Sequence, residues 1–218
     1  MENSANEFAG SWEVLEATLP NGQFAYTGTI DIKENRSVFK LDWEITAGRY
    51  VGIGLPIKSH LFVSCGEQRA GLGVALFHVR PNSDVAIQWC TPEMQGGIGG
   101  GAFTSRFNRD FEGEHELAQY FPDGSLHGTW TVVIKKTGSI FEILWRKGEA
   151  IHFRGLGLQM ASGLAVSWYP DTRQLALLDY VFDPLDSDCL LATWALGGFT
   201  SLGTEKLKRK LSRSAERP

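Results

Sequence analysis

Hydrophobic and polar residues alternate along short segments of the chain, and this alternation predicts β-strands. In residues 38–44, Phe39, Leu41 and Trp43 fall on one face of the segment, and three charged residues fall on the other. A period of two is typical of a strand with one buried face. No segment of a dozen residues has the 3.6-residue apolar stripe of a surface helix. The pattern therefore predicts an all-β protein.

The same pattern occurs twice. The segment Ser37–Trp43 matches Ser139–Trp145, and other blocks follow in the same order, at an offset of 102–103 positions until the last block. An unchanged order along the chain indicates a tandem duplication. The other matched blocks are Phe8–Glu13 with Phe111–Glu116, Pro20–Gly22 with Pro122–Gly124, Thr27–Lys33 with Thr129–Lys135, Gly52–Leu55 with Gly155–Leu158, Leu61–Ser64 with Leu164–Ser167, and Phe103–Ser105 with Phe199–Ser201.

Each copy is predicted to fold as a meander of about seven or eight short strands, since proline–glycine turn formers separate the matched blocks. One ring of fourteen strands would enclose a wide lumen, whereas side chains can fill a barrel of seven or eight. We therefore expect two up-and-down barrels related by a pseudo-twofold axis. The expected boundaries are residues 8–107 for the first barrel, 111–208 for the second and 209–218 for a basic tail, with a linker near 106–110.

The recurring motifs are G-x-W/H-E, P-N/D-G, F-x-L/I-x-W, G-x-G-L and L-x-V-S. With these motifs the chain resembles a widespread group of small bacterial β-proteins, mostly uncharacterised, whose single units end in Leu-Gly-Thr-Glu. The second copy carries this ending at Leu202–Glu205, and the first copy lacks it. The resemblance covers nearly the whole chain and implies a lipocalin- or avidin-like barrel. It implies no particular chemistry.

Composition and charge narrow the classes of partner. The chain of 218 residues is 43% hydrophobic and 21% charged, which is typical of a globular protein. The net charge of −4 argues against nucleic-acid binding. No apolar run approaches the length of a membrane span, so no membrane partner is expected. The basic residues at 206–217 are expected to form a solvated terminus.

The cysteines predict the cellular compartment. Cys65, Cys90 and Cys189 are odd in number and widely spaced, so we expect three free thiols instead of disulfides or a zinc site. The first residues lack the pattern of a secretory signal. A cytoplasmic location is therefore predicted. The five histidines show no metal-binding spacing and are expected at the surface or at a barrel rim, so neither a metal nor another cofactor is predicted.

The largest difference between the two copies suggests a binding site. Fourteen positions separate Trp89 from Phe103, but only five separate Trp194 from Phe199, so the first copy is expected to carry nine extra residues at 92–100. A glycine-rich loop at a barrel rim could serve as a mobile lid or as an anion cradle, or it could be a flexible connector. A P-loop is excluded because the Gly-Lys-Ser/Thr sequence is absent. The candidate ligand-binding residues are Trp89, Met94, Gly96, Gly97, Gly99 and Gly100.

Two ionisable residues on an apolar face are the candidate catalytic groups. Leu72, Val74, Leu76 and His78 share one side of a predicted strand, and Asp179 takes the place of Leu76 in the second copy. A buried carboxylate there would have a raised pKa and could act with His78 as a general acid or base. The alternative is that this face lies toward solvent near the end of the strand, or that Asp179 is paired with an arginine or a backbone N–H.

Three functions remain open. We favour a carrier that binds a small apolar or aromatic molecule in a barrel pocket. The first alternative is an enzyme, such as a cyclase or isomerase, that uses the same pocket with an aspartate or histidine as acid or base. The second is a structural protein with filled barrels and no ligand. Assembly into a homo-oligomer is also open.

Overall fold

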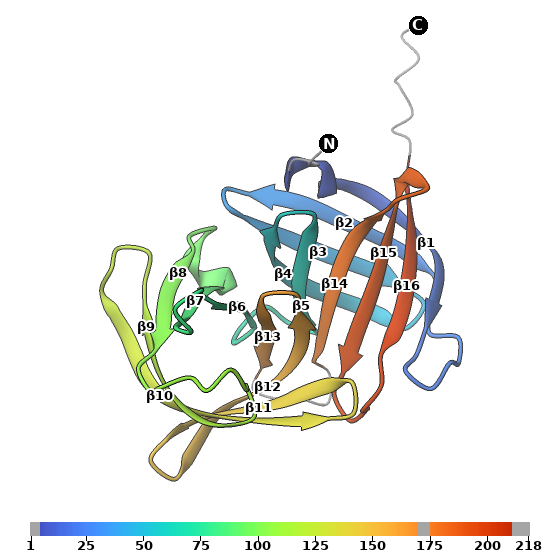
Figure 1. The fold of residues 1–218 in the computed structure, drawn as a ribbon. Helices are drawn as coiled ribbons and strands as arrows, with labels where there is room; N and C mark the ends of the chain where they lie inside the picture. The colour runs from blue at the N-terminus through green and yellow to red at the C-terminus, as the bar shows by residue number, and fades with distance from the viewer. Residues whose placement is uncertain (1–4, 170–174, 211–218) are drawn as a thin grey trace, which may run out of the picture.

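The computed structural model describes residues 5–169 and 175–210, which form strands and two short 3-10 helices (Figure 1). The helices are η1 (Ala5–Phe8) and η2 (Pro92–Met94). The strands of the first copy are β1 (Gly10–Thr18), β2 (Gly28–Asn35), β3 (Val38–Ile45), β4 (Gly48–Ile57), β5 (His60–Gly66), β6 (Gly73–Val79), β7 (Val85–Cys90) and β8 (Gly99–Phe103). Those of the second are β9 (Gly113–Tyr120), β10 (Leu126–Thr137), β11 (Ile140–Lys147), β12 (Ala150–Met160), β13 (Gly163–Tyr169), β14 (Ala176–Asp183), β15 (Asp186–Leu196) and β16 (Gly203–Arg209).

The strands close into two antiparallel barrels of eight strands each, so the prediction of two up-and-down barrels is confirmed. Barrel A consists of β1–β5 together with β14–β16, and barrel B consists of β6–β13. In Figure 1 the orange and red strands β14–β16 accordingly stand beside the blue strands of barrel A. Barrel B is formed by one continuous stretch of chain. In the sequence, this stretch lies between β5 and β14 of barrel A.

The predicted division at residues 106–110 is wrong, because the two copies exchange their last three strands. The chain passes between barrels after β5 and again after β13, so β5 pairs with β14 and β13 pairs with β6. Residues 8–107 and 111–208 are therefore repeats, but neither is a barrel. The segment near 106–110 connects two neighbouring strands of barrel B, β8 and β9. The two copies have the same strand pattern, so alternation alone does not decide which copy supplies the closing strands.

The alternating side chains fill each lumen as predicted. Trp43 and Trp145 lie at equivalent positions inside barrels A and B and are each 2% exposed. Each indole lies over a glycine of the next strand, where a Cβ on Gly52 or Gly155 would come within 2.7 Å of the ring. This close approach explains the first glycine of the repeated G-x-G motif.

A third cluster of buried side chains joins the two barrels. It contains outward-facing residues of both, including Phe62 of barrel A and Leu72, Val74 and Leu76 of barrel B. The apolar face that the sequence predicts on β6 is thus buried, but against the other barrel instead of inside a lumen. Burial on both faces is the reason that β5 and β13 are nearly continuous apolar runs.

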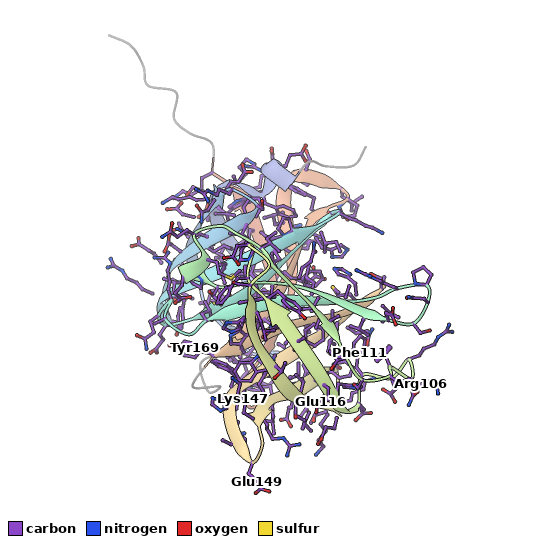
Figure 2. The ribbon with its side chains drawn as sticks, turned by 90° about the vertical axis from the view of Figure 1, so that its left-hand side faces the viewer. Arg106, Phe111, Glu116, Lys147, Glu149 and Tyr169 are labelled. Carbon is purple, nitrogen blue, oxygen red and sulfur yellow. The ribbon has the colours of Figure 1, made fainter. Side chains whose placement is uncertain are left out.

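One end of each barrel is plugged by equivalent residues. Trp12 donates its indole Nε1–H to the Phe8 carbonyl oxygen at 3.0 Å, and the ring Nε2 of His115 lies 2.9 Å from the Phe111 carbonyl oxygen. Since a carbonyl only accepts, His115 carries its proton on Nε2. Figure 2 shows Phe111 and Arg106 at one side of barrel B, away from Tyr169 at the end of β13. The opposite ends of both barrels remain available for a site.

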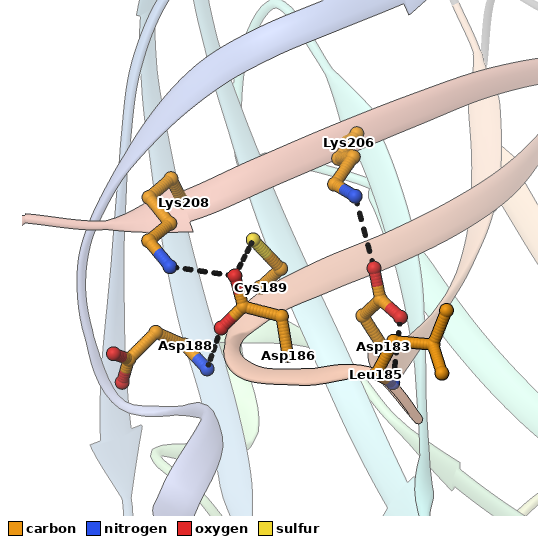
Figure 3. Close-up of polar contacts among 7 residues, drawn as sticks. All are labelled: Asp183, Leu185, Asp186, Asp188, Cys189, Lys206 and Lys208. Carbon is orange, nitrogen blue, oxygen red and sulfur yellow. Dashed lines mark hydrogen bonds and ion pairs between the residues drawn. The ribbon is translucent and has the colours of Figure 1, made fainter.

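The basic C-terminal segment begins inside a strand, which corrects the predicted tail. Lys206 and Lys208 of β16 form ion pairs with the two residues that flank the turn between β14 and β15 (Figure 3). Lys206 lies 2.9 Å from Asp183, and Lys208 lies 2.7 Å from Asp186. The pKa of Asp186 is lowered to about 2, mainly by the hydrogen bond from Lys208. Arg209 is the last residue of β16, and residues 211–218 of the predicted tail lie outside the described part of the chain.

The cysteines are free, as predicted. Cys65 lies in the lumen of barrel A, Cys90 lies between the barrels, and all three thiols are buried. Burial raises the pKa of the Cys65 and Cys90 thiols well above the ordinary value. Within residues 5–169 and 175–210, no helix has the length and apolar character needed to cross a membrane.

Candidate functional site

The unplugged end of barrel B holds a pocket of about 560 Å³. Its wall comes from the ends of β7 and β9–β13, from the two connections 91–98 and 121–125, and from Gly71 before β6. The lining residues are Gly71, Trp89, Thr91, Glu93, Met94, Gln119, Phe121, Pro122, Asp123, His127, Trp145, Phe153 and Trp168. This volume is within the range of pockets that hold drug-sized molecules.

Aromatic rings form a continuous wall in this pocket. The ring centroids of Trp89 and Trp168 are 6.4 Å apart, and those of Trp168 and Trp145 are 5.6 Å apart. His127 lies 4.9 Å from Trp89 and packs edge-on against Phe121 at 4.7 Å. Rings set at an angle to one another give an incoming planar molecule both faces and edges to contact. The wall is therefore suited to an apolar or aromatic ligand.

Hydrogen bonds hold the Trp89 ring of this wall in place, and the lowered pKa of His127 leaves its ring uncharged. Trp89 donates Nε1–H to the carbonyl oxygens of Gly100 at 2.9 Å and Tyr120 at 3.2 Å, which fixes its indole. Burial, with a smaller contribution from Lys147, lowers the pKa of His127 below its ordinary value, so the imidazole is neutral at pH 7. Lys147 is the last residue of β11 (Figure 2). Its ammonium lies 4.3 Å from the centroid of the Trp130 ring.

Gln119 is the one buried polar side chain among these lining residues, whereas Glu93 and Asp123 are exposed at the rim. Gln119 is 5% exposed, and its amide makes no hydrogen bond to another described residue. Gln119 pairs across the sheet with Gly101, and the equivalent pair in barrel A is Ala17 with Glu205. In each barrel this pair joins one long polar residue to one small residue. The polar residue is on β9 in barrel B and on β16, the equivalent of β8, in barrel A. The Gln119 amide is not among the fully buried polar atoms that lack a partner, so it is open to the pocket and can bond to a ligand there.

The predicted nine-residue insertion in the first copy is wrong. The strand register pairs Trp89 with Gly99 and Trp194 with Gly203, at separations of ten and nine positions. The two connections therefore differ by one residue. The match of Phe103-Thr-Ser to Phe199-Thr-Ser is a coincidence of three residues, since Phe103 is equivalent in register to Leu207 of β16.

The 91–98 connection is packed against its surroundings and is not a free lid. Gly96 has φ of +88° and lies against the Asn35 carbonyl of barrel A, where a side chain would clash. Gly97 lies against Pro122, at 2.8 Å from an ideal Cβ. Met94 packs against both the barrel B lumen and the inter-barrel cluster. The connection is thus a fixed part of the rim.

The predicted ligand-binding residues are only partly brought together. Trp89 and Met94 line the pocket, and Gly99 lies beneath the Trp89 ring. Gly96 and Gly97 position the connection, and Gly100 faces open space while its carbonyl oxygen accepts the bond from Trp89. The repeat pattern indicates Trp145 as a core residue and does not single out the other lining residues, Gln119, Phe121, His127, Phe153 and Trp168. Gln119 has a usable signal, because it is a polar residue in phase with the apolar face of a predicted strand.

The structure does not bring the two predicted catalytic residues together. Asp179 is on β14 of barrel A and His78 is on β6 of barrel B. Asp179 alternates with the lumen residues Leu178 and Tyr180, so it faces outward. It lies 2.8 Å from His60, and burial raises its pKa while His60 opposes the shift. Asp179 is thus a paired residue on an outer face, but its partner is His60 and not the expected arginine or backbone N–H.

Within residues 5–169 and 175–210 no group of three or more potential ligands could hold a metal ion. Comparison of the chain with protein-family models, with curated proteins and with solved structures found no match.

Proposed function

We propose that the protein binds a small molecule with an apolar or aromatic body in the unplugged end of barrel B. The observation that carries this proposal is a pocket of about 560 Å³ walled by Trp89, Trp145 and Trp168, with the unpaired amide of Gln119 at its side. Burial of a planar ligand against these rings would supply the free energy of binding, and the amide would select for a donor or acceptor on the ligand.

The free cysteines support the expectation of a reducing compartment such as the cytoplasm for this binding protein. The barrel B pocket also lies in a fold resembling lipocalin- or avidin-like barrels, as the motifs imply. Both points are consistent with a carrier.

The test is titration with N-phenyl-1-naphthylamine, a neutral aromatic dye whose fluorescence rises in apolar surroundings. Phe121 is 38% exposed at the pocket rim, so Phe121→Ala should weaken dye binding about tenfold with little loss of stability. The matched control is Leu19→Ala, which removes the equivalent residue of barrel A. Equal dye affinity in Phe121→Ala and the unmodified protein would contradict the site.

A Gln119→Leu variant separates polar recognition from apolar burial. It keeps the approximate volume and removes the amide, so dye binding should persist. Native mass spectrometry of freshly purified protein would then report any co-purifying molecule, and we expect that molecule to be lost from Gln119→Leu if it bonds to the amide.

A further inference from the structure

The lumen of barrel A contains a buried acid at the position where barrel B has Gly101. Glu205 is 3% exposed, accepts a hydrogen bond from Tyr26 Oη at 3.0 Å on one carboxyl oxygen, and accepts one from Tyr180 Oη at 2.5 Å on the other. Barrel B has Gly128 and Phe77 in place of the two tyrosines. The cluster is therefore particular to barrel A and is not required to close a barrel.

Glu205 has no positive partner. No lysine, arginine or histidine among the described residues forms an ion pair with it. Its neighbour Lys206 faces the opposite side of β16 and pairs with Asp183. A buried carboxylate that is hydrogen-bonded but not neutralised is costly to ionise. A cation placed near it would offset that cost.

An aromatic pocket lies next to this cluster. The unplugged end of barrel A holds about 260 Å³, and its wall includes the rings of Tyr26, Trp43, Tyr50 and Trp194. The Tyr26 ring forms part of this wall while its hydroxyl contacts Glu205, so one side chain connects the pocket to the acid. Ring faces attract cations, and cages of such rings bind organic ammonium groups.

We infer that barrel A is a second binding site, selective for small organic cations such as primary amines with an apolar body. The aromatic rings would enclose the cation, and Glu205 would supply the counter-charge through the Tyr26 side of the pocket. The smaller volume limits the ligand to a single ring or a short chain. Barrel B has Gln119 in place of the buried acid, and the acids that line its pocket, Glu93 and Asp123, are exposed at the rim, so barrel B would not share this preference.

The preference should depend on pH. Burial raises the pKa of Glu205 from 4.5 to about 7, with the two tyrosine hydrogen bonds opposing the shift. The titratable groups that face it are Tyr26, Tyr180 and Cys65, and burial raises the pKa of each, so they stay neutral between pH 6 and 8. The cross-strand neighbours, Ala17 and Ala192, are apolar. Glu205 is then mostly protonated at pH 6 and mostly ionised at pH 8.

The test compares benzylamine, which is protonated at neutral pH, with its neutral counterpart benzyl alcohol by calorimetry on the full chain. At pH 8 we expect the amine to bind about tenfold more tightly than the alcohol. At pH 6 the preference should shrink severalfold. Equal affinities at pH 8, no binding of either compound, or a preference unchanged between pH 6 and 8 would each overturn the inference.

Variants assign the effect to barrel A. Glu205→Gln should abolish the preference for the amine, and Gln119→Leu should retain it. Leu19→Ala should weaken benzylamine binding while Phe121→Ala leaves it unchanged, which is the reverse of the pattern expected for the neutral dye. A preference that survives in folded Glu205→Gln contradicts the inference. If that variant does not fold, the pH dependence of the unmodified protein decides.

Discussion

Arg209, on the last strand of barrel A, stacks on Trp12 of the first strand, with its guanidinium carbon 4.2 Å from the indole centroid. The same guanidinium donates to the carbonyl oxygens of Ala9 at 2.8 Å and Glu7 at 2.5 Å. Since β1 and β16 are neighbours in the barrel, this residue joins the two ends of the chain. It also covers the plugged end, where Trp12 is bonded to Phe8.

Replacing Arg209 with alanine should lower the free energy of unfolding by about 1–3 kcal/mol, because a cation–π contact and two charge-assisted hydrogen bonds are lost. Urea unfolding measures the change. Lys210→Ala removes a neighbouring exposed charge and should be near neutral. A similar loss in both variants would show that net charge, and not the stacking on Trp12, matters.

The strand exchange can be tested with one added thiol. Cys65 of β5 lies opposite Ala176 of β14 in the sheet, and both side chains point into barrel A. Mild oxidation of Ala176→Cys should therefore join the added thiol to Cys65, as shown by peptide mass mapping. If each copy closed on itself, Cys65 would instead face the region of Gly73, and no such cross-link would form. Ala86→Cys, on β7 of barrel B, is the control and should not react with Cys65.

Glu205 should make stability depend on pH. Because its pKa is raised on folding, the native state binds more protons than the unfolded state between pH 4.5 and about 7. The contribution of Glu205 to the free energy of unfolding is therefore most favourable below pH 4.5. It falls by about 3 kcal/mol at most as the pH rises through 7. Urea unfolding of Glu205→Gln at several pH values should lack this component. Parallel pH profiles for the two proteins would contradict the burial of an unneutralised acid.

Two adjacent glycines of β8 should respond differently to substitution. A Cβ on Gly99 would lie 2.5 Å from Trp89 Nε1, whereas a Cβ on Gly100 would meet nothing within 4 Å. Gly99→Ala should therefore displace the indole, cost about 1–3 kcal/mol of stability and weaken dye binding. Gly100→Ala should leave both quantities close to those of the unmodified protein. Thermal unfolding and dye titration report the two effects.

The repeats and the buried alternation are predictable from the sequence, because both depend on local pattern. Phe39, Leu41 and Trp43 face a lumen as their spacing indicates, and Trp145 repeats the position of Trp43. The free cysteines also follow from spacing and number. These features need no knowledge of which strands meet.

Features that depend on distant pairing are not predictable in the same way. The partner of β5 is β14 instead of β6, and both have the same pattern of apolar residues. The face of Leu72, Val74 and Leu76 is buried as expected, but the sequence does not distinguish burial in a lumen from burial against a second barrel. The prediction for Asp179 is wrong for this reason. The site is only partly predicted because Gln119 lies outside the matched blocks.

The order of synthesis has a physical consequence for barrel A. Strands β1–β5 are complete at Gly66, but their partner β14 begins at Ala176, so at ~5–20 residues per second the sheet waits roughly 5–20 seconds. During that time β1 and β5 are unpaired edges, which are sites for pairing with other strands. The nearest available strand is β6, whose pairing with β5 would give the unexchanged barrel. Barrel B is complete at Tyr169, before β14 is made, and its closure removes β6 from this competition.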